Sequence, residues 1–164
     1  MQTICLLGLG YIGLPTGSIF ALAGKDVIGV DPSPRVQAAL RSGLASFDEP
    51  ELQTLVTAAI NSGRLRVQTR PEAADAFIIA VPTPLDPATN RADLSFVERA
   101  ARDIVPLLRR GNLVILESTV PPGTTRDVLA PILAESGLVP GRDICVAHCP
   151  ERVLPGRILV ELEQ

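Results

Sequence analysis

The sequence predicts an α/β fold built on a doubly wound, mostly parallel sheet. Short apolar runs of strand length alternate along the chain with longer segments of helical pattern. The first run, residues 4–7, leads directly into a glycine-rich turn, and polar residues follow several later runs. Such alternation is typical of parallel sheets that carry helices on both faces.

The glycine-rich turn has the spacing Gly8-x-Gly10-x-x-Gly13 and is followed by an apolar segment of helical length, residues 14–23. In such a unit the first glycine makes the tight turn and the second lets the backbone approach a pyrophosphate. The third lets the helix pack closely on the strand, and the helix N-terminus attracts phosphate. The spacing predicts a dinucleotide-binding unit, with a purely structural turn as the alternative.

An acidic residue follows the second predicted strand, residues 27–30. Asp31 lies 18 positions after Gly13. A carboxylate at about this spacing accepts hydrogen bonds from the hydroxyls of the adenosine ribose. Its charge also repels a 2′-phosphate, so the sequence predicts NAD rather than NADP as the cofactor.

Composition excludes several other classes of protein. The chain has 164 residues, a net charge of −3, 46% apolar and 3% aromatic residues. This length suits one domain, and the charge and aromatic content do not favour nucleic acid as a partner. No apolar run has the length of a membrane span and no signal peptide opens the chain, so we expect no membrane partner and a cytoplasmic location.

The cysteines and the single histidine form no metal-ligand pattern, so we expect no metal. Cys5 and Cys145 lie in apolar runs and are predicted to be core thiols. Cys149 is a candidate nucleophile, although a structural role is favoured. His148 is expected to be a packed or hydrogen-bonded residue.

The remaining elements follow from periodicity and from proline and glycine signals. Further strands are expected at residues 65–68, 76–80, 112–116 and 143–147; helices at 33–42, 51–61, 94–109 and 121–135; a helical turn at 72–75; and a surface loop at 84–92. Thr83, Thr119 and Glu151 follow predicted strands. Because the ends of parallel strands converge, these residues are expected near one crevice with the glycine turn and Asp31.

Four motifs appear in order: residues 8–15 (Gly-Leu-Gly-Tyr-Ile-Gly-Leu-Pro), 80–84 (Ala-Val-Pro-Thr-Pro), 117–125 (Glu-Ser-Thr-Val-Pro-Pro-Gly-Thr-Thr) and 149–156 (Cys-Pro-Glu-Arg-Val-Leu-Pro-Gly). With them the chain resembles the NAD-binding domain of the nucleotide-sugar 6-dehydrogenases, the UDP-glucose/GDP-mannose dehydrogenase family. The last motif is most similar to the branch that oxidises UDP-N-acetyl-mannosamine to its uronic acid. UDP-glucose is disfavoured because the loop after Glu151 differs from that of the UDP-glucose branch.

The resemblance implies a role for each matching residue. The residues implied to bind NAD are Gly8, Gly10, Tyr11, Ile12, Gly13, Asp31, Thr83 and Thr119. Glu151 matches a catalytic acid associated with hydrolysis of a thioester intermediate. Arg152, Val153 and Leu154 match a loop that touches the substrate sugar.

The family reaction is a double oxidation of a UDP-sugar. One hydride leaves to give an aldehyde, a cysteine traps the aldehyde, a second hydride leaves a thioester, and water releases the acid. A carboxylate such as Glu151 suits the last step because it can take a proton as water attacks.

Family members are more than twice as long as this chain. We therefore expect residues 1–164 to form a single NAD-binding domain that lacks the dimerising helix, the C-terminal UDP-binding domain and the nucleophilic cysteine. The expected consequences are that the chain alone does not turn over substrate and that the full-length enzyme is a homo-oligomer. The alternatives are another NAD-dependent dehydrogenase of the hydroxyacid type and a stand-alone dinucleotide-binding module.

Overall fold

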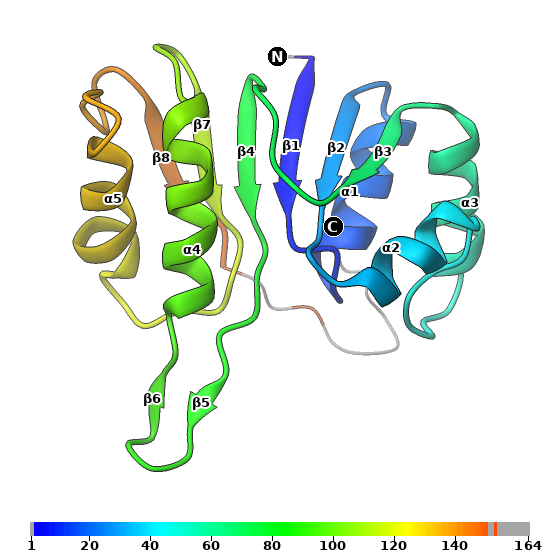
Figure 1. The fold of residues 1–164 in the computed structure, drawn as a ribbon, viewed down its shortest axis with the longest axis horizontal. Coiled ribbons are helices and arrows are strands. Elements are labelled where there is room, and N and C mark those ends of the chain that lie inside the picture. The colour runs from blue at the N-terminus through cyan, green and yellow to red at the C-terminus, as the bar shows by residue number, and fades with distance from the viewer. Residues whose placement is uncertain (1, 151–152, 154–164) are drawn as a thin grey trace.

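A central sheet with helices on both faces forms the domain (Figure 1). The computed structural model describes residues 2–150 and residue 153. The elements, in chain order, are β1 Thr3–Leu7, α1 Gly13–Leu22, β2 Asp26–Val30, α2 Pro34–Arg41, α3 Leu52–Asn61, β3 Leu65–Gln68, β4 Ala76–Ile79, β5 Leu85–Asp86, β6 Arg91–Ala92, α4 Ser95–Ile104, a 3₁₀ turn Val105–Leu107, β7 Leu113–Leu116, a π-helical turn Thr125–Leu129, α5 Ala130–Ala134 and β8 Cys145–His148.

The main sheet has the strand order β3-β2-β1-β4-β7-β8, and each neighbouring pair is parallel. The predicted fold class is confirmed. The order places β1 in the middle, with β2 on one side and β4 on the other. The chain therefore builds outward from β1 in both directions, as in doubly wound dinucleotide-binding domains.

The two faces of the sheet bury two different sets of side chains. Along β1, Cys5 and Leu7 belong to a core completed by α4 and α5, whereas Ile4 and Leu6 belong to a core completed by α1, α2 and α3. Successive side chains of a strand point to opposite faces. Because helices cover both faces, the strand is apolar throughout.

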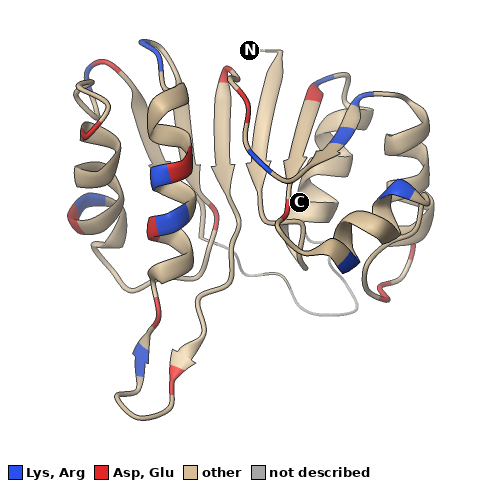
Figure 2. Ribbon diagram, viewed as in Figure 1, with Lys and Arg blue, Asp and Glu red and all other residues tan. Residues whose placement is uncertain are grey.

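Charged residues lie mainly on the helices and connecting loops, and both signs are interspersed there (Figure 2). On α4, for example, Arg102 forms an ion pair with Glu98 at 3.1 Å. Among the described residues, none belongs to a helix that is long and apolar enough to cross a membrane.

Two helices differ from the prediction. The helix expected at 94–109 is α-helical only to Ile104 and continues as a 3₁₀ turn. Pro106 explains the change, because it has no N–H to donate to the preceding turn. The helix expected at 121–135 begins only at Thr125, because Gly123 has a left-handed φ of 89° and the first turn is π-helical.

Two connecting segments also differ. Residues 72–75 form no helical turn, because the Asp75 carboxylate instead accepts hydrogen bonds from the N–H groups of Gln2 and Thr3, at 2.7 and 3.1 Å. The loop expected at 84–92 contains the antiparallel hairpin β5–β6, which projects away from the sheet (Figure 1). Asn90 enables the tight turn with a φ of 53°.

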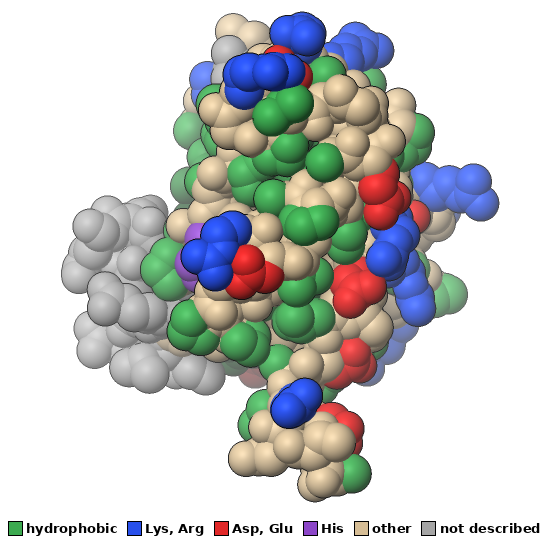
Figure 3. Space-filling model, turned by 90° about the vertical axis from the view of Figure 1, so that its left-hand side faces the viewer, with side chains coloured by type: hydrophobic (Ala, Val, Ile, Leu, Met, Phe, Trp, Pro, Cys, Tyr) green, Lys and Arg blue, Asp and Glu red, His purple; other side chains and the backbone are tan. Residues whose placement is uncertain are grey.

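Of the two predicted core thiols, one is confirmed and one is wrong. Cys5 is buried, which raises its pKa to about 11. Cys145 is exposed, because β8 is an edge strand with β7 as its neighbour in the sheet. Hydrophobic side chains gather on the side of the molecule where β8 and α5 lie (Figure 3).

Candidate dinucleotide-binding site

The carboxyl ends of β1, β2, β4 and β7 meet at one edge of the sheet. Backbone hydrogen bonds extend the ladder beyond the strands: Gly8 N–H donates to Val30 O and Ala80 N–H donates to Leu7 O, both at 2.8 Å. The strands that follow β1 are added on one side of it as β2 and β3, and then on its other side as β4, β7 and β8. The carboxyl ends of β1 and β4 therefore mark the topological switch point, where open α/β sheets bind ligands.

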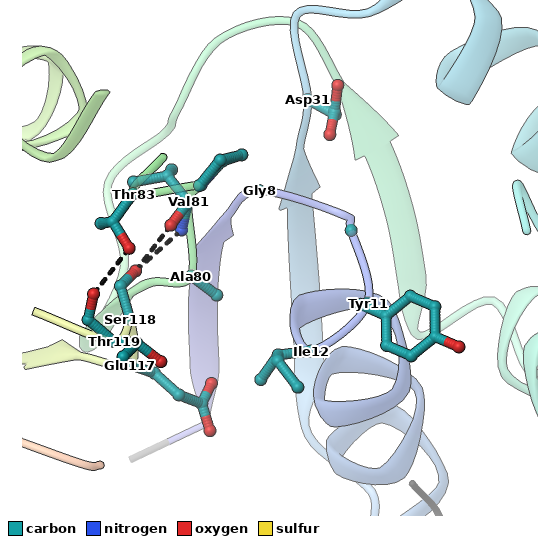
Figure 4. A pocket seen from close by; sticks show the side chains of 12 residues that line it. Gly8, Tyr11, Ile12, Asp31, Ala80, Val81, Thr83, Glu117, Ser118 and Thr119 are labelled. Carbon is teal, nitrogen blue, oxygen red and sulfur yellow. Dashed lines mark hydrogen bonds between the residues drawn. The ribbon is translucent and has the colours of Figure 1, made fainter. Parts of the chain in front are cut away.

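A pocket of about 350 Å³ opens at this edge (Figure 4). Its walls come from the glycine turn after β1, the end of β2, and the segments that follow β4 and β7. The structure brings most of the predicted cofactor residues together here: Gly8, Gly10, Tyr11, Ile12, Asp31, Thr83 and Thr119 all line the pocket. They come from four separate segments of the sequence, so the convergence follows from the fold.

The three glycines of the turn have different reasons to be glycine. Gly8 has a φ of 95°, and a Cβ there would lie 2.3 Å from Ala80 O. A Cβ on Gly13, which is buried behind the pocket at the start of α1, would lie 1.9 Å from Gly8 O. The tight turn and the close packing predicted for these two residues are confirmed.

Gly10 is different, because the described part of the chain supplies no steric reason for a glycine there. A Cβ on Gly10 would have no neighbour within 4 Å, and its φ lies outside the left-handed region. Gly10 is also one of the residues that line the pocket. The geometry leaves bare backbone facing a cavity, as close approach of a ligand requires.

Asp31 is held in place by backbone donors on both of its carboxylate oxygens. Leu9 N–H, in the glycine turn, donates to Oδ2 at 3.0 Å, and Ser33 N–H donates to Oδ1 at 2.9 Å. An ionised carboxylate has about four lone-pair sites, so two bonds leave capacity for further donors. Asp31 therefore links the glycine turn to the end of β2 and can still accept hydrogen bonds from a ligand in the pocket.

Two hydroxyl groups fix the wall opposite the glycine turn, where dashed lines mark their bonds in Figure 4. Ser118 Oγ accepts from Val81 N–H at 3.1 Å and donates to Val81 O at 2.8 Å. Thr83 Oγ1 donates to Thr119 O at 2.6 Å. These bonds join the segments after β4 and β7, so this wall of the pocket is preformed.

Five residues that line the pocket were not predicted from the sequence, and two of them, Glu117 and Ser118, are polar. Glu117 and Ser118 directly follow the strand that ends at Leu116, and this position, which also predicts Thr119, is the sequence signal that indicates them. Glu117 also affects Cys149: burial, and then the Glu117 carboxylate, raise the pKa of this thiol. A raised pKa keeps the thiol protonated and does not suit a nucleophile.

A second pocket of about 280 Å³ adjoins the first and shares Gly8, Asp31, Val81 and Pro82 with it. It extends over the end of β2 towards Phe96 and Arg99 of α4. The two pockets meet at the glycine turn and Asp31. Together they form an extended crevice across the switch point, which suits a long ligand such as a dinucleotide.

The predicted residues of the last motif are placed only in part. Glu151, Arg152 and Leu154 lie outside the described residues, and Val153 is half-buried. His148 Nδ1 donates to Leu116 O at 3.0 Å. This confirms the expectation that the histidine is a hydrogen-bonded residue.

The parallel sheet, the glycine turn, the acidic end of β2 and the crevice at the switch point define a dinucleotide-binding domain of the Rossmann type. The sequence model of the UDP-glucose/GDP-mannose dehydrogenase family, NAD binding domain, matches residues 2–164. The chain belongs to this family, as the resemblance in sequence predicted.

Individual relatives of the chain are also dehydrogenases of nucleotide sugars. The chain is 50% identical over 163 residues to a UDP-N-acetyl-D-mannosamine dehydrogenase of Methanocaldococcus jannaschii, covering 98% of this chain and 37% of that protein. It is 48% identical over 169 residues to an NDP-N-acetyl-D-galactosaminuronic acid dehydrogenase of Ralstonia nicotianae, covering 98% of this chain and 40% of that protein. The native structure of the UDP-N-acetyl-mannosamine dehydrogenase of Staphylococcus aureus superposes with a TM-score of 0.93 at 48% identity, over 98% of this chain and 39% of that one. The chain therefore spans about two fifths of the length of these relatives.

Proposed function

We propose that NAD lies across the two adjoining pockets, held by Gly8, Gly10, Tyr11, Ile12, Asp31, Thr83 and Thr119, with Gly13 setting the helix behind them. The observation that carries this proposal is the open space at Gly10. A glycine with no steric partner in the described chain, facing a pocket, is explained by a ligand that approaches the backbone. The start of α1 next to it supplies N–H groups and a partial positive charge for the pyrophosphate.

The direction of the cofactor follows from Asp31. Its remaining lone pairs suit the hydroxyls of the adenosine ribose, which puts the adenine in the second pocket, towards Pro32 and Phe96. The nicotinamide then occupies the first pocket, between Ile12 and the wall formed by Glu117 and Thr119. NAD bound there would supply a hydride acceptor, and Thr83 and Thr119 would line the nicotinamide end of the site.

We further propose that residues 1–164 serve as the NAD-binding domain of an enzyme that oxidises UDP-N-acetyl-mannosamine to its uronic acid. Support comes from the name UDP-N-acetyl-D-mannosamine dehydrogenase, which several relatives at 46–50% identity carry, although the Ralstonia nicotianae relative in the same range is named for an N-acetyl-galactosaminuronic acid. In this proposal Glu151 takes a proton from the water that releases the acid, and Arg152, Val153 and Leu154 contact the sugar. The complete enzyme is a cytoplasmic homo-oligomer, assembled through segments outside residues 1–164.

The complete gene product is expected to form two NADH per UDP-N-acetyl-mannosamine consumed, measured by absorbance at 340 nm, with UDP-glucose as the parallel substrate. Glu151→Gln should leave a rapid first NADH but slow release of the acid, because the water loses its proton acceptor. Turnover of UDP-glucose in preference to UDP-N-acetyl-mannosamine would contradict the substrate assignment. Equal slowing of both steps would contradict the role of Glu151.

A further inference from the structure

The glycine turn is tied to a distant loop through the side chain of Tyr11. The Tyr11 hydroxyl donates a hydrogen bond to Glu49 Oε2 at 3.0 Å, and its ring stacks on Phe47 with centroids 4.7 Å apart and an interplanar angle of 22°. Both partners lie in the connection between α2 and α3, residues 42–51. In Figure 4 Tyr11 lies on the glycine-turn side of the pocket, and its ring points away from Thr83 and Thr119 on the other side.

Glu49 is unusual for a loop carboxylate because only 6% of its surface is exposed. Burial of a carboxylate is costly unless the charge is hydrogen-bonded, and a bond from a hydroxyl to a carboxylate is among the stronger hydrogen bonds. The bond to Glu49 raises the pKa of Tyr11, with smaller contributions from burial and from the Glu49 and Asp48 charges. This is the direction expected for a phenol that donates a hydrogen bond to a carboxylate.

The loop that carries Glu49 is itself anchored. Gln53 of α3 accepts from Ala45 N–H at 3.0 Å and donates to Gly43 O at 2.8 Å. Glu49 O accepts from Leu52 N–H at 3.2 Å, at the start of α3. A rigid helix thus holds the loop, and the loop in turn holds Tyr11.

Tyr11 is the residue after Gly10, whose backbone has no steric restraint from a side chain of its own. A turn that must present backbone to a pyrophosphate loses affinity if it has to be ordered on binding. A fixed side chain on the neighbouring residue removes that cost. We propose that Glu49 is a positioning residue for the cofactor site, which acts through the Tyr11 hydroxyl to preset the glycine turn. The inference rests on the proposed binding of NAD at this turn.

A double-mutant cycle on NAD affinity, measured by calorimetry, tests this role. Tyr11→Phe and Glu49→Gln are each expected to raise the Kd for NAD by about three- to tenfold, on the scale of one hydrogen bond. The double variant should bind no more weakly than the weaker single variant, because both changes act on the same bond: Tyr11→Phe removes its donor, and Glu49→Gln replaces its charged acceptor with a weaker, neutral amide oxygen. Glu51→Gln, which removes an exposed carboxylate two positions away, is the matched control and should leave the Kd unchanged.

A second readout uses the composition of the chain. It contains one tyrosine and no tryptophan, so tyrosinate absorbance at 295 nm follows Tyr11 alone. Glu49→Gln should lower the pKa of Tyr11 towards its ordinary value of about 10, and Glu51→Gln should not. If Glu49→Gln does not fold, Glu49→Asp takes its place in the cycle, because it keeps the charge but shortens the side chain that accepts the hydrogen bond from the Tyr11 hydroxyl.

Additive effects of the two changes on the Kd, or an unchanged Kd in both single variants, would overturn the positioning role while leaving NAD binding intact. A Tyr11 pKa that is the same in the unmodified chain and in the Glu49→Gln variant would show that the bond does not form in solution, and would overturn the role as well. Failure of the unmodified chain to bind NAD would overturn both this inference and the proposed function.

Discussion

Gly10→Val is expected to weaken NAD binding by about 100-fold or more while leaving the fold intact. The branched side chain would enter the space where the pyrophosphate needs bare backbone, and each charge-assisted hydrogen bond lost there is worth about 1.5–3 kcal/mol. The fold should survive because a Cβ at this position meets nothing within 4 Å in the described structure. Calorimetry gives the affinity and thermal unfolding gives the stability.

Gly10→Ala is the graded control for that experiment. A single methyl fills less of the pocket, so its Kd should lie between those of the unmodified chain and the valine variant. Normal NAD binding by the valine variant would show that the turn has only a structural role.

Gly13→Ala is expected to give the opposite result, a large loss of stability. Its Cβ would lie 1.9 Å from Gly8 O and 2.7 Å from a methyl of Leu6, so the backbone of the turn or the start of α1 has to move. Overpacking against backbone costs on the order of 3 kcal/mol. Chemical denaturation monitored by circular dichroism would measure this loss.

Gly17→Ala is the matched control on the same helix. There the new Cβ would meet Val27 Cγ1 at 3.5 Å and Leu6 Cδ1 at 3.6 Å, both ordinary contacts. Alanine is favoured over glycine inside a helix by about 1 kcal/mol, so this variant should be as stable as the unmodified chain or more so. Equal stability of the Gly13 and Gly17 variants would contradict the packing role of Gly13.

The sequence predicted the sheet well because its strands are buried on both faces. Runs such as residues 4–7 and 76–80 are apolar at every position, and the parallel arrangement follows from the helices between them. Edge effects were harder to foresee. Cys145 lies in an apolar run, yet in the described part of the chain β8 pairs only with β7, and Cys145 is exposed.

Where the predicted helices and loops differ from the structure, the cause is a local interaction that the apolar periodicity of the sequence does not indicate. The apolar spacing of α4 continues beyond Ile104, but Pro106 changes the helix to a 3₁₀ turn. The region of residues 72–75 has helix-favouring composition, but the Asp75 carboxylate bonds to the start of β1 instead. A single sequence does not show such contacts between segments more than 70 positions apart.

Within the site, residues at strand ends were predictable and supporting contacts were not. The sequence predicts that Asp31, Thr83 and Thr119 lie near one crevice because parallel strand ends converge, and all three line the same pocket. The bond from Tyr11 to Glu49 joins positions 38 apart in sequence, and no periodic pattern relates them. The sequence therefore gives no sign that Glu49 contacts the glycine turn.

The most direct test of the account compares NAD with NADP on the unmodified chain and on Asp31→Asn, by calorimetry. The unmodified chain should bind NAD at least about tenfold more tightly than NADP, and Asp31→Asn should reduce this preference by about 1–3 kcal/mol. The ratio of the two affinities is the informative quantity, because loss of the bond from Asp31 to Leu9 N–H would weaken both cofactors alike. Equal binding of NAD and NADP by the unmodified chain would contradict the assignment of this crevice as an NAD site. An unchanged preference for NAD in Asp31→Asn would contradict the role of Asp31 in selecting NAD over NADP.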